Sequence, residues 1–231
     1  HLSGGRAAWN VVTTAYAKSS AVFGRPHPPH AERYAMAEEF VEACRLLWDS
    51  WDDDAFSADK ANARFVKPGS LHVPAFHGKY VTVEGALNVP RCPQGHPVLI
   101  QAGSSGPGQA LAARIADVVF TAQNELEEGR AFYRALKSQV EGFGRDPAQV
   151  LVMPGVFPVV GRSEREAREL FTELNAQIDT TPQALTVLSD RLGTDMSAYP
   201  LDEPLPPQEQ IAWELDIERK THRRFGEERA P

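Results

Sequence analysis

Between residues 98 and 115 the sequence places small polar residues where they could bind an anion. Residues 98–100 (Val-Leu-Ile) form a short apolar run between Pro97 and Gly103, which is typical of a buried strand. Residues 103–108 (Gly-Ser-Ser-Gly-Pro-Gly) then provide hydroxyls and backbone N–H groups, and residues 110–115 have helical spacing. A strand, a small-residue turn and a helix N-terminus together can bind a phosphate. The same pattern also fits an ordinary strand-to-helix turn, and the rest of the chain has to separate the two interpretations.

Two other groups of residues invite a metal interpretation. Residues 52–54 are three consecutive aspartates, but they lack the alternating ligands and the turn glycine of a calcium loop. A solvated turn is therefore the better interpretation. His72 and His77 have no third ligand at suitable spacing nearby, which favours surface or packing roles over zinc. We predict no metal site, and a zinc-dependent hydrolase is the least favoured alternative.

Composition narrows the class of protein. The 231 residues suffice for one large domain, and a net charge of −7 argues against nucleic acid or an anionic membrane as the main partner. No apolar run approaches the roughly 20 residues that span a bilayer. Cys44 and Cys92 are too few for a disulfide framework, so we expect a reducing, cytoplasmic setting. The chain opens on a turn at His1 rather than Met, from which we expect preceding elements in a parent protein.

Strand and helix patterns alternate along the chain. A strand in residues 7–14 precedes the clearest helix, residues 31–48, and short alternating pieces between 65 and 92 predict inserted β-hairpins. After the central turn the pattern gives a strand at 117–122, a helix at 126–143 and a strand unit at 150–160. Ser163 and Glu166 then form a capping box for another helix. Alternation of this kind predicts parallel βαβ units, which make half of an eight-stranded barrel or most of a doubly wound sheet. The absence of a second glycine-rich dinucleotide signature disfavours the doubly wound option.

Five stretches in this order carry a family resemblance: residues 2–13 (Leu-Ser-Gly-Gly-Arg-Ala-Ala-Trp-Asn-Val-Val-Thr), 30–34 (His-Ala-Glu-Arg-Tyr), 47–55 (Leu-Trp-Asp-Ser-Trp-Asp-Asp-Asp-Ala), 93–95 (Pro-Gln-Gly) and 101–105 (Gln-Ala-Gly-Ser-Ser). Together they resemble the bacterial-luciferase-like flavin monooxygenases of the nitrilotriacetate, dibenzothiophene-sulfone and long-chain-alkane monooxygenase branch. Weaker matches extend the resemblance to about residue 178. The chain departs from the family pattern at Ala8, where a glycine is usual, and at Val22, where an asparagine is common.

The resemblance implies an α/β fold of the TIM (β/α)8 type. Residues 1–178 are then a partial barrel covering about strands 4–7, with residues 65–92 as an inserted β-hairpin segment. Residues 179–231 are expected to form a proline-rich and charged insertion or tail to which no chemistry is assigned. In family members, the earlier strands of the barrel also contribute to the flavin and substrate pocket. We therefore expect part of the site to lie outside this sequence.

The activity implied by the resemblance is that of a two-component monooxygenase. Reduced FMN (FMNH2) reacts with O2 to form a flavin C4a-(hydro)peroxide, which oxygenates a small organic substrate. A separate NAD(P)H:flavin reductase supplies the reduced flavin, and members are commonly homo-oligomers, dimers or tetramers. No residue is assigned as a general acid or base, and substrate identity is not encoded in a recognisable motif.

The resemblance also implies roles for particular residues. On the strand of residues 7–14, Asn10 is a candidate partner of the isoalloxazine or substrate, and Thr13 of the ribityl chain or phosphate. His30 and Tyr34 are four residues apart, hence on one helix face, and Tyr34 resembles the phosphate-binding tyrosine of the family. His30 is a candidate donor to the phosphate or the ribityl chain, and a loop histidine before the helix explains it equally well. Without the resemblance, a capped strand explains Asn10 and Thr13 equally well, and a tyrosine on an amphipathic helix is usually a core residue.

The loop after the strand of residues 98–100 completes the predicted cofactor site. Ala102, Gly103, Ser104 and Ser105 are expected to surround the flavin phosphate, with backbone N–H groups and hydroxyls directed to the dianion. A βα loop at a strand's carboxyl end is also where barrel enzymes place their sites.

Two further functions stay open. A deazaflavin-dependent oxidoreductase on the same barrel would transfer hydride instead of activating oxygen, and flavin-dependent oxygen uptake would separate the two. A non-catalytic flavin-binding fragment is the alternative from another class, because half a barrel exposes strand edges and core surface.

Overall fold

The computed structural model describes residues 1–14, 17–123, 125–177, 185–189 and 195–199. The chain divides into two compact units, His1–Gly155 and Val156–Pro231, each of which is treated by itself. The first unit contains the sheet and every residue of the predicted cofactor site. The domain boundary expected near residue 178 stays a prediction.

A four-stranded parallel sheet organises the first unit. Its strands are β1 (Ala8–Asn10), β6 (Val98–Gln101), β7 (Val118–Thr121) and β8 (Leu151–Pro154), paired in the order β1-β6-β7-β8. In the register, Trp9 lies opposite Leu99, and Val119 lies opposite Val152. Neighbouring parallel strands need crossover connections, and these are supplied by helices α2 (His30–Trp48), α3 (Gly106–Ile115) and α4 (Leu126–Gly142).

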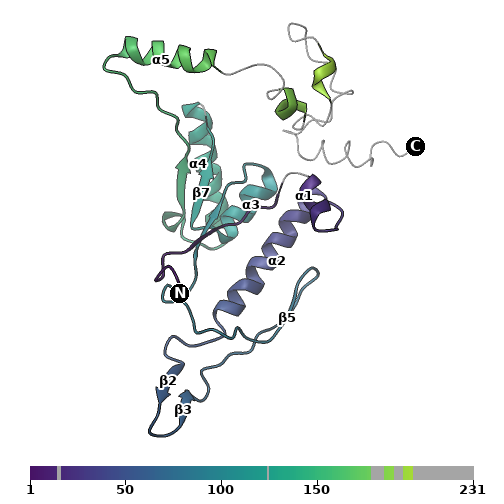
Figure 1. The fold of residues 1–231 in the computed structure, drawn as a ribbon, viewed down its shortest axis with the longest axis vertical. Helices are drawn as coiled ribbons and strands as arrows, with labels where there is room; N and C mark the ends of the chain where they lie inside the picture. The colour runs from purple at the N-terminus through teal and green to yellow at the C-terminus, as the bar shows by residue number, and fades with distance from the viewer. Residues whose placement is uncertain (15–16, 124, 178–184, 190–194, 200–231) are drawn as a thin grey trace, which may run out of the picture. The chain divides into compact units, whose positions relative to one another are not determined.

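The three helices bury one face of the sheet (Figure 1). One core cluster joins Leu99 of β6 to Val41 of α2 and to Leu111 and Ile115 of α3. A second cluster joins Val119 of β7 to apolar residues of α3 and α4, among them Ala112, Phe132, Leu136 and Val140. The predicted helices at 31–48 and 126–143 therefore form with nearly the expected bounds, because their apolar residues repeat every three to four positions.

The opposite face of the sheet is apolar as well, but exposed. Side chains alternate between the two faces of a strand, so Val98, Phe120, Leu151 and Met153 lie on the face away from the helices, and all four are exposed. Parallel strands are normally buried on both faces and are apolar on both. A sheet with helices outside and an apolar inner face is the arrangement of one side of a βα barrel.

Two β-hairpins are inserted between α2 and β6. Strands β2 (Phe56–Asp59) and β3 (Arg64–Val66) form the first, and β4 (Ala75–His77) and β5 (Thr82–Glu84) form the second. The hairpin prediction was right for β4 and β5, but the insertion begins earlier than residue 65. Strand β2 was missed because the sequence of residues 56–59, Phe-Ser-Ala-Asp, contains a single large apolar residue and gives little alternating signal.

The tip of the second hairpin is held by Glu39 of α2. Its carboxylate accepts hydrogen bonds from the backbone N–H groups of Lys79 (3.0 Å), Tyr80 (2.6 Å) and Val81 (2.6 Å). Desolvation would raise the pKa of the Glu39 carboxyl, but these hydrogen bonds outweigh it and hold the pKa below its ordinary value. The inserted hairpin is thereby fixed against the middle of the helix.

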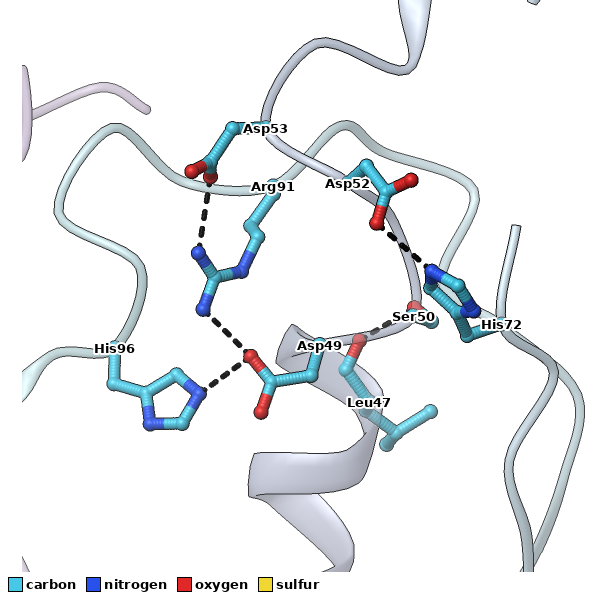
Figure 2. A network of polar contacts seen from close by, with 8 residues as sticks. All are labelled: Leu47, Asp49, Ser50, Asp52, Asp53, His72, Arg91 and His96. Carbon is cyan, nitrogen blue, oxygen red and sulfur yellow. Dashed lines mark hydrogen bonds and ion pairs between the residues drawn. The ribbon is translucent and has the colours of Figure 1, made fainter. Parts of the chain in front are cut away.

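A polar network connects the end of α2 to the segment that leads into β6 (Figure 2). Asp49, the C-cap residue of α2, accepts hydrogen bonds from Arg91 (2.7 Å) and His96 (2.8 Å), and Arg91 also bonds Asp53 (2.9 Å). Asp52 pairs instead with His72 (2.8 Å). Asp52 and Asp53 thus bind different side chains, and Arg91 and His96 join the end of α2 to the segment that enters β6.

The second unit begins with a segment that leads to α5 (Glu164–Ala176). The predicted cap is present: Ser163 Oγ accepts from the Glu166 N–H (3.2 Å). The Glu166 carboxylate accepts from the N–H of Arg162 (2.5 Å), the residue before the N-cap, where the expected capping box has the N–H of Ser163 itself. Most of residues 179–231, to which no chemistry was assigned, lie outside the described residues. In the part of the chain that is described, no helix is long and apolar enough to cross a membrane.

Further short elements among the described residues are α1 (Ala17–Val22) and η1 (Pro147–Gln149) in the first unit, and η2 (Met196–Ala198) in the second. Helix α1 was not among the predicted elements, because glycine, proline and histidine dominate residues 23–30 and indicate a loop there.

Candidate functional site

The loop of residues 102–105 connects β6 to α3 at the carboxyl edge of the parallel sheet. Ser105 is the N-cap of α3: its Oγ accepts a hydrogen bond from the backbone N–H of Gly108 (3.2 Å), and Pro107 occupies the first turn. The N-terminus of α3 therefore points its partial positive charge towards this loop. The turn has the local geometry that binds anions in other proteins.

Helix α2 begins beside the same loop. His30, its first residue, is 4% exposed, and its Nε2 lies 3.3 Å from Ser105 Oγ. The His30 ring also packs edge-on against Tyr34, with centroids 4.9 Å apart. The structure thus brings together His30, Tyr34 and Ser105, which the sequence resemblance placed in one site.

The hydroxyl of Tyr34 fits between two glycines. A Cβ added to Gly103 would lie 2.9 Å from Tyr34 Oη and 2.9 Å from the Cα of Gly108. A Cβ added to Gly108 would meet the same hydroxyl at 3.0 Å. Because real Cβ contacts are longer, only glycine lets the tyrosine hydroxyl, the loop and the first turn of α3 approach this closely.

Gln101 is a member of this group that sequence reasoning left without a role. It is the last residue of β6, 2% exposed, and its Oε1 accepts a hydrogen bond from the backbone N–H of Gly103. The expectation that the Gly103 N–H faces an anion therefore differs from the structure, in which that donor is directed to Gln101. The sequence did contain a signal for Gln101, because it is a polar residue at the end of an otherwise apolar strand.

The remaining predicted residues are Asn10 and Thr13 at and after the end of β1, and Ala102 and Ser104 in the loop itself. Asn10 ends β1 and is exposed, Ala102 is exposed, and Ser104 accepts a hydrogen bond at its carbonyl from Gln109 Nε2 (2.9 Å). No hydrogen bond among the described residues joins Asn10 or Thr13 to the loop of residues 102–105. Asn10 lies opposite Ile100 of β6 in the sheet, and Thr13 follows β1.

Thr13 lines a cavity of about 480 Å³ between the end of β1 and α2. Its walls include Trp9 and Phe40, whose rings pack edge-on with centroids 5.9 Å apart, and the tip of the second hairpin. Arg33 also lines this cavity, and burial lowers the pKa of its guanidinium from the ordinary value. Arg33 Nη1 contacts the ring of His27.

Metal-ligating side chains do not gather in the described part of the chain: no group of three or more His, Cys, Asp or Glu residues there could hold a metal ion. The polar groups beside α3 are hydroxyls, one imidazole, one amide and a helix N-terminus. That donor set suits an anion with several oxygen atoms.

Comparison with known proteins identifies the family of this chain. The family model for luciferase-like monooxygenases matches residues 1–228. The N-acetyl-S-(2-succino)cysteine monooxygenase of Bacillus subtilis is 49% identical over 208 residues, which are 89% of this chain and 47% of that protein. Nitrilotriacetate monooxygenase component A of Aminobacter aminovorans is 44% identical over 208 residues, 89% of this chain and 46% of that protein.

Solved structures show the same fold. A riboflavin lyase crystallised with modified FMN and riboflavin superposes with a TM-score of 0.82 at 33% identity, over 97% of this chain and 49% of that one. A long-chain alkane monooxygenase superposes with a TM-score of 0.81 at 31% identity, over 89% of this chain and 48% of that one. The sheet, its helices and the inserted hairpins thus have counterparts in luciferase-like TIM barrels.

The chain belongs to the luciferase-like monooxygenase family. It spans about half the length of the curated relatives that it matches. The expected family and the expected barrel fold, seen here as four parallel strands with an inserted hairpin segment, are both confirmed.

Proposed function

We propose that this chain binds the phosphate of FMN and forms part of a two-component monooxygenase that uses reduced FMN and O2. The observation that carries the proposal is the convergence of Tyr34 Oη, the Ser105 hydroxyl and the N-terminus of α3 at the carboxyl edge of the sheet. A phosphate dianion offers these donors several acceptor oxygens, and the helix N-terminus favours its charge.

The residues present fit that group. Two glycines leave the space that a phosphate-binding loop needs, and in both cases a Cβ would collide with Tyr34 Oη. The His30 imidazole lies behind Ser105 and restricts the orientation of its hydroxyl. When bound, reduced FMN would supply the electrons that activate oxygen, and the chain's own residues would anchor its phosphate and orient its ring system.

The names of two relatives support the use of reduced flavin and of a second protein component. One relative in Pseudomonas putida is named as an FMNH2-dependent dimethylsulfone monooxygenase, and "component A" in the nitrilotriacetate enzyme names one part of a multi-component system. From these names we infer a small organic substrate and a separate flavin reductase for this chain. A cytoplasmic location and a dimeric or tetrameric assembly remain predictions, as do the roles of Asn10 and Thr13.

The test uses the purified chain in two stages. Calorimetric titration with FMN and with riboflavin measures whether the phosphate contributes to binding, and we expect FMN to bind at least about tenfold more tightly. Oxygen uptake is then followed with NADH, a flavin reductase and FMN. Equal affinity for FMN and riboflavin would contradict the phosphate site.

The second stage separates the functions left open. Free reduced FMN itself consumes O2, so the reductase reaction without the chain is the reference. Flavin binding that leaves the course of oxygen consumption equal to that reference would favour a non-catalytic flavin-binding fragment. The exposed apolar inner face of the sheet supports the interpretation as a non-catalytic fragment. A flavin site on one side of a barrel lacks the walls that would exclude water from it.

A further inference from the structure

Gln101 has no assigned role, although it ends the central strand of the candidate site. We infer that Gln101 is a positioning residue: its amide oxygen holds the Gly103 N–H, and this sets the loop conformation in which Ser104, Ser105 and Tyr34 receive the FMN phosphate. The inference rests on the proposed function, whose phosphate site it deepens.

The burial of Gln101 is the first observation. Its side chain lies on the helix-facing side of β6, two residues after Leu99, which belongs to the core shared with α2 and α3. An apolar residue would continue that pattern. A buried amide costs free energy unless it is hydrogen-bonded, and the bond from the Gly103 N–H satisfies its oxygen.

The bond closes the first turn of the loop. It joins a strand residue to the backbone two positions later, so the chain turns directly after β6. This turn places the Gly103 Cα against Gly108 and Tyr34, where the Cβ positions of both glycines lie within 3.0 Å of the hydroxyl. A loop packed this closely can adopt few other conformations. The hydrogen bond to the Gln101 amide stabilises the one that is observed.

The bond also determines which N–H donors of the site are used within the protein. The Gly103 N–H is directed inwards to Gln101, and the Gly108 N–H is directed to Ser105 Oγ. These two bonds occupy the Gly103 and Gly108 N–H groups. The donors that would then receive the anion are the Ser104 and Ser105 backbone N–H groups and hydroxyls, together with Tyr34 Oη. Gln101 acts on the phosphate only through the loop.

The experiment compares the affinities for FMN and riboflavin in Gln101→Met and in wild type. Methionine keeps the length of the side chain but accepts hydrogen bonds only weakly. The expected result is a loss of about five- to tenfold in FMN affinity, the scale of one hydrogen bond, with riboflavin affinity unchanged. Gln123→Met is the matched control: Gln123 follows the neighbouring strand β7 and bonds Thr121 (2.9 Å), away from the loop.

Three outcomes overturn the inference in distinguishable ways. If Gln101→Met keeps the wild-type preference for FMN, the residue does not position the loop. If the affinities of Gln101→Met for FMN and riboflavin fall by the same factor and its melting temperature falls too, the role of Gln101 is structural only. If wild type itself fails to prefer FMN, the proposed phosphate site fails first. Should Gln101→Met not fold, Gln101→Leu replaces it, since its aliphatic side chain offers the Gly103 N–H no acceptor and is expected to lose the same preference.

Discussion

His30 Nε2 lies 3.3 Å from Ser105 Oγ, which joins the first residue of α2 to the N-cap of α3. A serine hydroxyl can accept two hydrogen bonds and donate one. The Gly108 N–H uses one acceptor position, and a His30 tautomer with its proton on Nε2 uses the other. In that arrangement the Ser105 hydroxyl can only donate, which suits an anion outside the helix.

Replacement of Ser105 tests its capping role. Ser105→Ala removes the acceptor for the Gly108 N–H, and loss of a serine N-cap typically destabilises a protein by about 0.5–2 kcal/mol. The free energy of unfolding in urea should fall by that amount. Ser104→Ala is the matched control, because the Ser104 side chain is exposed and takes no part in the cap. Equal stability of the two variants would argue against the cap.

Glycine substitutions test the close approach of α3, the loop and α2. In Gly103→Ala the new Cβ would meet Tyr34 Oη and the Gly108 Cα at 2.9 Å, so backbone or ring must move. Overpacking of this kind costs about 1–3 kcal/mol, and FMN affinity should fall with it. Gly106→Ala provides the control, since no atom lies within 4 Å of its added Cβ. Thermal melts are measured for both variants. A loss of stability in Gly103→Ala alone indicates a steric clash, whereas equal changes in both variants indicate only the loss of glycine flexibility.

Tyr34→Phe isolates the hydroxyl. The ring remains available for packing with His30 and with the core around Val41 and Leu111, so stability should change little. A hydrogen bond to a charged group contributes about 1.5–3 kcal/mol, so FMN affinity should drop roughly 10- to 100-fold while riboflavin affinity stays constant. Tyr133→Phe on the exposed side of α4 should leave both affinities unchanged. A parallel loss for riboflavin would assign Tyr34 to packing alone.

The Glu39 carboxylate predicts a pH dependence of the second hairpin. Its pKa is held below the ordinary value in the folded chain, so its contribution is present above that ordinary value and is lost as the pH falls through the lowered one. Hydrogen exchange of the Lys79, Tyr80 and Val81 amides should therefore accelerate, beyond its intrinsic pH dependence, as the pH falls below about 4.5.

Two variants complete that experiment. Glu39→Gln should show fast exchange at the hairpin tip already at pH 7, with little further change on acidification, because a neutral amide replaces the carboxylate. Glu42→Gln, an exposed position on the same helix, should behave like wild type. Slow exchange at the tip in Glu39→Gln would show that the hairpin holds its position without the carboxylate.

Local patterns predict the elements of this chain better than they predict its site. The helix at His30–Trp48 and the cap at Ser163 follow from spacing that neighbouring residues determine, and both are present. The role of Gln101 depends on the direction in which one buried amide turns, and the neighbours of Asn10 depend on how β1 pairs with β6. Contacts of that kind arise from packing between distant segments, which a local pattern does not encode.

The pairing of β1 with β6 has a consequence for folding kinetics. Ala8 lies opposite Val98, so α2 and two hairpins intervene between strands that share backbone hydrogen bonds. Neighbouring strands β6, β7 and β8 are joined by one short connection each. Folding rates fall as contacts become more distant in sequence, so β6 to β8 with α3 and α4 should assemble first. The attachment of β1 should be the slow step, and the site that Tyr34 completes should appear only at the end of refolding.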